Sequence, residues 1–227
     1  MMPVSLSGGV EPGARTGTSV SAQPVVVWRG QDGVVRAWAD RCPHRGMRLS
    51  LGFVRDNTLT CIYHGWSFGW LADGDGGDGK CLAVPSHPGA APPAKASVPA
   101  LPAAEALGMI WVGTGPGDTT VPPDAGRGRE AVHPVRSVTV QAPAPALRAA
   151  LEAAPPPGTE TAETTEADGG LIAFNGPAVR VLAAIQDRGD GAAAAHVVTT
   201  RADTPTRKAL CLWAALVRDR LAAVMLP

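Results

Sequence analysis

Two short motifs limit what this chain can fold into more than any other feature of the sequence. One is C-P-H-R-G from residue 42 and the other is C-I-Y-H-G-W from residue 61, so each supplies one cysteine and one histidine. Two thiolates and two imidazoles are the ligands of one kind of [2Fe–2S] cluster, in which cysteines hold one iron and histidines the other. The sequence therefore predicts one such cluster per chain, with Cys42, His44, Cys61 and His64 as its ligands.

The same four residues are also a ligand set for structural zinc. Zinc ligands usually come in like pairs, such as C-x₂₋₄-C or H-x₃₋₅-H, whereas each motif here mixes the two residue types. Gly46 and Gly65 lie just beyond the two histidines, and glycine lets a loop turn sharply enough to direct backbone N–H groups at sulfur. The spacing favours the iron–sulfur interpretation, and zinc stays open as the alternative.

With these motifs, residues 25–113 resemble the Rieske domain of ring-hydroxylating and O-demethylating oxygenases. The similarity runs through residues 41–50, 61–66 and 108–113. It implies an antiparallel β domain, a sandwich of the iron–sulfur-protein type with two loops forming a cluster-binding tip. It also implies a reductase or ferredoxin as electron donor and a mononuclear iron, in a catalytic oxygenase subunit, as acceptor. Homo- or hetero-oligomers are implied as well.

Three positions bear on the type of Rieske cluster that the resemblance implies. High-potential respiratory members carry an extra cysteine in each loop, joined as a disulfide, and the matching positions here are Met47 and Tyr63. Trp66 stands where those members have a serine whose hydroxyl tunes the cluster. Fewer hydrogen bonds to a cluster lower its reduction potential. We therefore expect a low-potential cluster of the oxygenase type.

Composition argues against several classes of partner. The chain has 20 basic and 20 acidic residues, so its net charge recommends neither nucleic acid nor an anionic membrane. No apolar run reaches the roughly 18 residues of a membrane span, and the N-terminus has no signal pattern, so we expect a cytoplasmic protein. Cys81 and Cys211 lie outside the motifs, and we expect them to be buried thiols without a disulfide.

Four segments with an overall α+β fold are expected. Residues 1–23 are rich in Gly, Ser and Pro and are expected to be loosely ordered. Residues 24–113 form the predicted Rieske domain. Residues 114–131, full of Gly, Pro and charge, are the predicted linker. Residues 132–227 have the element order of a truncated, helix-grip-like α+β domain, the architecture of the oxygenase catalytic domain.

The elements of the second half follow from periodicity and turn residues. Residues 155–170 are expected to be a loop, whereas Thr204 is the predicted N-cap and Pro205 the first position of a C-terminal helix. One face of that helix is apolar at Leu210, Trp213, Val217, Leu221 and Val224. Strands are predicted at 135–140, 171–175, 179–185 and 193–200, and a short helix at 143–154.

Residues 73–79, D-G-D-G-G-D-G, contain two patterns that we reject. G-x-G-x-x-G binds dinucleotides only where it opens a helix, and residues 80–84 have the pattern of a strand. The three aspartates suggest calcium, but the EF-hand register would need an oxygen ligand at Gly77 and a glycine at Asp78. We expect a solvated hairpin turn.

The second half lacks the pattern of a mononuclear iron site. A 2-His-1-carboxylate triad is the usual arrangement, and in the family that the chain resembles its two histidines share a helix. Beyond the Rieske domain the chain has only His133 and His196, and His87 lies in a proline-rich segment. The predicted helix at 143–154 contains Glu152 but no histidine. We expect His196 to be a core or edge residue of a strand, and the domain to be degenerate, without mononuclear Fe(II).

Three functions remain open, and whether the chain is itself an enzyme stays open with them. The first is a Rieske-type oxidoreductase component that carries one electron at a time, within or beside an oxygenase system. The second is a divergent ring hydroxylase or O-/N-demethylase whose iron is held by residues such as His133, His196 and Asp187. The third is a non-redox interaction module with a structural cluster. The missing triad favours the first over the second, and the redox-type loops argue against the third.

Overall fold

The fold is α+β, as expected: the described residues form four antiparallel sheets and two α-helices. The computed structural model describes residues 1–69, 79–115, 117–118, 131–165 and 170–225. Most of the predicted hairpin turn at 73–79 and most of the predicted linker at 114–131 lie outside these residues. None of the helices in the described ranges is long and apolar enough to cross a membrane.

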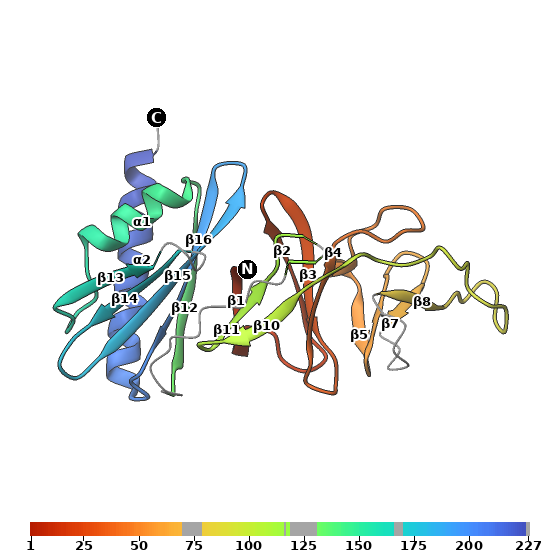
Figure 1. The fold of residues 1–227 in the computed structure, drawn as a ribbon, viewed down its shortest axis with the longest axis horizontal. Coiled ribbons are helices and arrows are strands. Elements are labelled where there is room, and N and C mark those ends of the chain that lie inside the picture. The colour runs from red at the N-terminus through yellow and green to blue at the C-terminus, as the bar shows by residue number, and fades with distance from the viewer. Residues whose placement is uncertain (70–78, 116, 119–130, 166–169, 226–227) are drawn as a thin grey trace.

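The N-terminal part consists of three small sheets (Figure 1). The first has the order β2 (Arg15–Val20), β3 (Gln23–Arg29), β4 (Val35–Ala39), β9 (Ala100–Leu101). The second has the order β5 (Phe53–Arg55), β6 (Thr58–Thr60), β7 (Ser67–Gly69), β8 (Lys80–Ala83). The third has the order β1 (Met2–Leu6), β11 (Met109–Val112), β10 (Ala103–Ala106). Short 3₁₀ helices lie at Ser7–Gly9 and Leu49–Leu51.

The expectation of a loosely ordered segment at residues 1–23 is wrong. β2 pairs with β3 along its whole length, and β1 pairs with β11 in the neighbouring sheet. Val4 and Val20 are buried there. The small and polar residues of this segment gave no local strand signal, because β1 is stabilised by hydrogen bonds to a strand that is distant in sequence.

The C-terminal part is one five-stranded sheet with two helices on one face (Figure 1). Its order is β12 (His133–Val140), β16 (Ala192–Thr199), β15 (Arg180–Gly189), β14 (Leu171–Asn175), β13 (Thr161–Thr165). The helices are α1 (Ala144–Ala153) and α2 (Thr204–Met225). The predicted strands and helices are confirmed, but β13 lies where a loop was expected. Its threonines suit an edge strand, and it pairs with β14 through five residue pairs.

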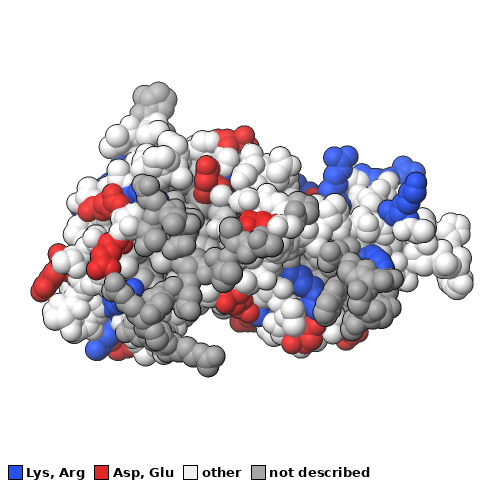
Figure 2. Space-filling view, viewed as in Figure 1, with Lys and Arg blue, Asp and Glu red and all other residues white. Residues whose placement is uncertain are grey.

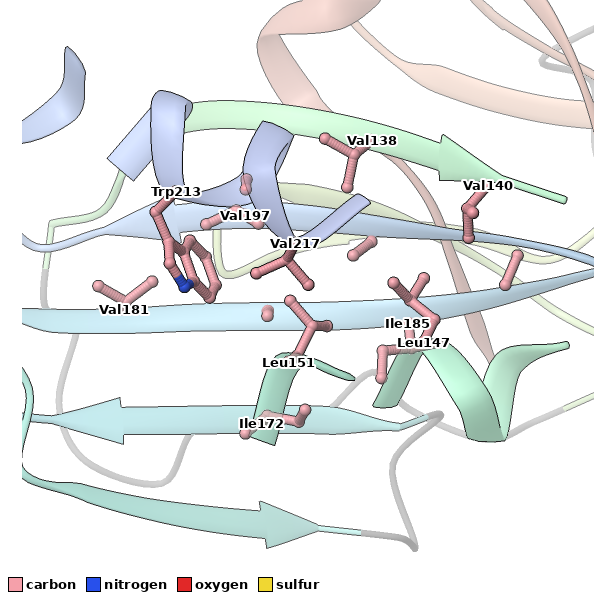
Figure 3. Close-up of a cluster of buried hydrophobic side chains, with 14 of the residues drawn as sticks. Val138, Val140, Leu147, Leu151, Ile172, Val181, Ile185, Val197, Trp213 and Val217 are labelled. Atoms are coloured by element: carbon pink, nitrogen blue, oxygen red, sulfur yellow. The ribbon is translucent and has the colours of Figure 1, made fainter. Parts of the chain in front are cut away.

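Apolar side chains fill the space between these helices and the sheet (Figure 3). Leu147 and Leu151 project from α1, and Trp213 and Val217 from α2. The Trp213 indole Nε1 donates a hydrogen bond to the Ala154 carbonyl at 2.6 Å, which ties the end of α1 to α2. Val138, Val140, Ile172, Val181, Ile185 and Val197 face them from the sheet.

The N-cap of α2 is Asp203, one residue before the predicted Thr204. The Thr206 backbone N–H donates to Asp203 Oδ1 at 3.0 Å, and Arg201 Nε donates to Asp203 Oδ2 at 2.9 Å. These bonds, Thr206 first, lower the pKa of the Asp203 carboxyl to about 2. Asp is at least as favourable as Thr at an N-cap, and the two residues are adjacent in the sequence. Of the predicted apolar stripe, Leu210, Trp213 and Val217 are buried, Leu221 is half-buried and Val224 is exposed.

The other face of the five-stranded sheet packs against the three-stranded sheet, which joins the two parts of the molecule. Met109 and Trp111 of β11 are fully buried against Leu182 of β15 and Val198 of β16. A polar contact lies beside them: Gln186 Nε2 donates to Thr18 Oγ1 and to the Ser19 carbonyl, both at 2.8 Å. The cluster motifs lie at the far end of the N-terminal part, next to β5–β8 (Figure 1).

Candidate iron–sulfur site

The two motifs fold into loops with the same backbone hydrogen bonds. In the first loop, residues 42–47, the Cys42 N–H donates to the Met47 carbonyl at 2.8 Å. In the second loop, residues 61–66, the Cys61 N–H donates to the Trp66 carbonyl at 2.9 Å. The loops therefore present their cysteines alike, although the histidine is the third residue of the first loop and the fourth of the second.

Glycine closes both turns, as the sequence predicted. The N–H of Gly46 donates to the carbonyl of Cys42, and that of Gly65 to the carbonyl of Cys61, at 2.9 and 3.0 Å. Gly46 has φ of 75° and Gly65 has φ of 69°, a region that favours glycine. A side chain at Gly65 would also meet Pro85, which lies 2.9 Å from the position of its Cβ. The proline-rich segment therefore packs against the second loop.

Thiols and imidazoles lie on opposite sides of the loops. Cys42 and Cys61 are each 2% exposed, in an apolar cluster that includes Leu59 and Phe68. His44 and His64 have exposed side chains, with ring centroids 4.6 Å apart. The structure thus groups the four candidate ligands two by two, a thiol pair inside and an imidazole pair at the surface.

The Cys42 sulfur accepts hydrogen bonds that stabilise its thiolate form. The pKa of the Cys42 thiol is raised to about 11, chiefly by burial and further by the neighbouring Cys61 thiol. Backbone N–H groups of His44 and Arg45 bond to the Cys42 sulfur and act to lower its pKa. Because a metal binds the thiolate, these N–H groups favour the bound form.

Aromatic rings hold both imidazoles. Trp66 stacks on His44, with ring centroids 4.5 Å apart and ring planes 6° apart. The rings of Tyr63 and His64 have centroids 3.9 Å apart. Desolvation, together with the positive charges of His64 and Arg45, lowers the pKa of His44. From the sequence, Trp66 and Tyr63 were notable only for the residues that they replace. The local signal for a packing role was that both lie within two positions of His64.

This donor set fits a [2Fe–2S] cluster. Neighbouring thiols in an apolar interior suit one iron, and a pair of imidazoles at the surface suits the other. Cys81 and Cys211 are not part of the set: both are free and half-buried, where buried thiols were expected. Cys211 Sγ donates to the Val135 carbonyl at 3.2 Å, which accounts for its position on α2.

The residues considered for a second iron do not come together. His196 is buried on β16, with Nδ1 2.8 Å from Ser137 Oγ and Nε2 3.3 Å from Gln186 Oε1, as expected of a core histidine. His133 is the first residue of β12, where it pairs with Thr199. It lies four residues before Ser137, the residue that pairs with His196. No three His, Cys, Asp or Glu side chains in the described part of the chain converge as ligands of one metal ion.

The acidic candidates are also apart. Asp187 is exposed near the end of β15, where its Oδ1 accepts the Gly189 N–H at 2.9 Å. Glu152 lies on the outer side of α1, and its Oε1 accepts the Thr164 hydroxyl at 2.9 Å. His87 is exposed in the proline-rich segment. These three side chains therefore lie in separate surroundings, and none of them needs a shared metal ion to explain its position.

Positive charge gathers around the cluster loops. Among residues 41–69 and 79–101, six residues are basic and only Asp56 is acidic. Figure 2 shows Lys and Arg side chains grouped at this end of the molecule. We call these six residues the basic tip: Arg41, Arg45, Arg48, Arg55, Lys80 and Lys95.

The N-terminal part is similar in sequence to known proteins. Residues 1–100 match the family model of the Rieske [2Fe-2S] domain. Oxidoreductase NdmD of Pseudomonas putida is 44% identical over 98 residues, which are 42% of this chain and 16% of that protein. The vanillate O-demethylase oxygenase subunit of Pseudomonas sp. (strain HR199 / DSM 7063) is 39% identical over 99 residues, 44% of this chain and 25% of that protein. The alignment thus spans a quarter or less of either relative.

Solved structures share the fold along nearly the whole chain. Dicamba monooxygenase with non-heme iron and dicamba superposes with a TM-score of 0.74 at 20% identity, covering 98% of this chain and 84% of that chain. NdmA of Pseudomonas putida CBB5 gives 0.72 at 18% identity, covering 100% and 81%. Residues 1–100 are therefore a Rieske [2Fe–2S] domain that resembles the N-terminal domain of oxygenase alpha subunits, within a chain that has the fold of dicamba monooxygenase and NdmA.

Proposed function

We propose that this chain is a one-electron carrier, a Rieske-type oxidoreductase component that works within or beside a non-haem iron oxygenase system. Cys42, Cys61, His44 and His64 would hold one [2Fe–2S] cluster, which when bound supplies one-electron chemistry at low potential. The observation that carries this proposal is the exposed imidazole pair opposite the buried thiol pair.

This arrangement gives the two sides of the site different tasks. The apolar surroundings of Cys42 and Cys61 exclude water from the sulfur side. His44 and His64 present ring edges at the surface, so a docked protein can approach them closely. Stacking on Trp66 keeps the His44 ring in one orientation, which suits repeated electron transfer without rearrangement.

The basic tip indicates what kind of protein donates electrons to this chain. Ile62 and Tyr63, exposed by 60% and 54%, lie in the second loop beside His64, at the end of the molecule where Lys and Arg side chains gather (Figure 2). An apolar centre with a charged rim suits a transient partner of opposite charge. We infer an acidic reductase or ferredoxin, whose reduction of this chain should slow several-fold between about 50 and 300 mM salt. A rate independent of salt would argue against this surface.

Oxygen chemistry would then belong to a separate catalytic subunit. Two observations support this assignment: His133 and His196 lie apart, and the space between the helices and the sheet is filled by apolar side chains (Figure 3). The alternative, a divergent oxygenase with its own mononuclear iron, draws support from the shared fold with dicamba monooxygenase.

Metal content separates these functions. The experiment measures iron, acid-labile sulfide and zinc per chain after anaerobic purification, with an EPR spectrum after dithionite reduction. About two irons, two sulfides and a Rieske-type signal would support the carrier. About three irons would replace it with the divergent oxygenase. Zinc without sulfide would overturn both, and a cluster that dithionite cannot reduce would indicate the structural module.

A further inference from the structure

A mainly polar pocket of about 270 Å³ lies between the two parts of the molecule, where the tips of the β2–β3 and β15–β16 hairpins meet (Figure 1). The two tips are in contact, since a Cβ at Gly189 would lie 2.5 Å from the Cβ of Ala22. A water molecule in the liquid takes about 30 Å³, so the pocket has room for a small ion and several waters. Three charged side chains line it: Arg48, Arg188 and Asp190.

The guanidinium of Arg188 is open to this pocket. Arg188 is half-buried and has no hydrogen bond or ion pair from its side chain in the part of the chain that the structure describes. None of its nitrogen atoms is buried without a partner, so all three are accessible to solvent. Its charge lowers the pKa of the buried His196, which places the guanidinium near that ring. His196 is linked through Gln186 to Thr18, which lies in the pocket wall.

The backbone of Arg188 is held in place from both parts of the molecule. The Ser19 hydroxyl of β2 donates a hydrogen bond to the Arg188 carbonyl at 2.6 Å. The register of β15 against β16 shifts between Asp187 and Gly189, which makes Arg188 the extra residue of a bulge. Bulges redirect a side chain and are frequent beside functional sites. A fixed backbone lowers the entropic cost of binding a ligand through this side chain.

The three charges of the pocket do not neutralise one another. Asp190 forms no ion pair with Arg48 or Arg188 among the residues that the structure describes, although all three line the same space. Guanidinium groups donate N–H bonds and suit the oxygens of an oxyanion. An ionised carboxylate can only accept, so it needs a donor from the ligand. The ligand that satisfies all three side chains is an oxyanion with an O–H of its own.

From these features we propose that the pocket binds the free hydrogen phosphate ion. Its unprotonated oxygens accept hydrogen bonds from Arg48 and Arg188, and its O–H donates to Asp190. Sulfate is also a tetrahedral oxyanion, but it has no O–H, so Asp190 repels it. A phosphate monoester loses its last O–H with a pKa of about 6 and is repelled in the same way above that pH.

The ion would join the two parts of the molecule, because Arg48 belongs to the N-terminal part and Arg188 to the C-terminal part. None of the four candidate cluster ligands lines the pocket. The proposal therefore does not depend on the proposed electron-transfer function, and either one can fail without the other.

The test is calorimetric titration of the full, cluster-loaded chain with inorganic phosphate, sulfate and glycerol 3-phosphate, at about pH 8 and constant ionic strength. Phosphate should bind at least tenfold more tightly than either of the other two. Arg188→Gln should weaken phosphate binding at least tenfold, because it removes charge-assisted hydrogen bonds. Arg220→Gln is the matched control, since Arg220 is exposed on α2 and outside the pocket, and its affinity should equal that of the wild type.

Asp190→Asn tests the selectivity for a protonated anion. Asn tolerates the φ of 53° at this position as Asp does, so the turn is kept. The amide can donate to sulfate and can also accept the O–H of phosphate, so the ratio of the two affinities should fall toward one. Thermal unfolding of each variant checks that it is folded. Equal affinity of the wild type for phosphate and sulfate, unchanged binding by Arg188→Gln, or no binding of phosphate at millimolar concentration would each overturn the proposal.

Discussion

At the scale of single residues, His64 and His87 make a matched pair for testing ligation. Both have exposed side chains, but only His64 lies in a cluster loop. His64→Ala should abolish the Rieske-type EPR signal, because one iron would lose an imidazole ligand. His87→Ala should leave the signal unchanged. The measurement is EPR of the dithionite-reduced variants, and a normal signal in His64→Ala would remove this residue from the ligand set.

His196 gives a prediction about pH. Burial, and then the charge of Arg188, lowers the pKa of His196 to about 4 in the folded protein, against about 6.5 in the unfolded chain. Between these values the unfolded state binds more protons, so the free energy of unfolding should decrease as the pH falls from 6.5 to 4. The decrease attributable to this residue is about 3 kcal/mol at most.

Urea unfolding at several pH values measures this effect by difference. His196→Gln keeps a polar side chain near Ser137 and Gln186 but does not titrate. The wild type should lose more stability than this variant between pH 7 and pH 4.5, and the two should run parallel above pH 7. Identical pH profiles would show that His196 is not protonated on unfolding in this range.

The candidate ligands could be found from the sequence because their spacing is local. Each cysteine and its histidine lie within one short loop, so no knowledge of the tertiary fold was needed to pair them. The ring contacts of Trp66 and Tyr63 were missed, since stacking depends on how the two loops face each other.

At the scale of elements, α2 offers a buried and an exposed leucine two residues apart. Leu210 is 0% exposed in the core between helix and sheet, whereas Leu212 is 64% exposed. Leu210→Ala should lower the free energy of unfolding by about 2–5 kcal/mol, because it leaves a cavity. Leu212→Ala should change it by about 0.5 kcal/mol or less. Urea unfolding of both variants is the test, and equal losses would contradict the packing of α2.

The sequence predicted elements well where periodicity was strong and poorly where pairing was distant. The apolar stripe of α2 and the strands β14, β15 and β16 were recognisable from short stretches of chain. β1 and β13 were not, since a strand of small or polar residues is defined by its neighbour in the sheet. The N-cap of α2 was misplaced by one residue because Asp203 and Thr204 are both good caps.

At the scale of the whole molecule, the interface between the two parts decides whether the Rieske domain is independent. A fragment ending at Gly113 would keep both cluster loops but lose the sheet that covers Met109 and Trp111, which are fully buried in the whole chain. Exposed apolar surface of this kind destabilises a fold and binds hydrophobic dyes. We expect residues 1–113 to unfold at a lower temperature than the whole chain and to bind such a dye.

Met109→Gln separates lost contacts from other effects of truncation. In the fragment it should reduce dye binding and leave the unfolding temperature nearly unchanged, because the side chain would face water. In the whole chain it should lower stability by several kcal/mol, since it buries an amide among apolar neighbours. If fragment and whole chain unfold at the same temperature, the interface contributes little and the Rieske domain folds alone. The lower temperature predicted for the fragment would instead mean that the C-terminal part supports the cluster domain by packing, whatever its own chemistry.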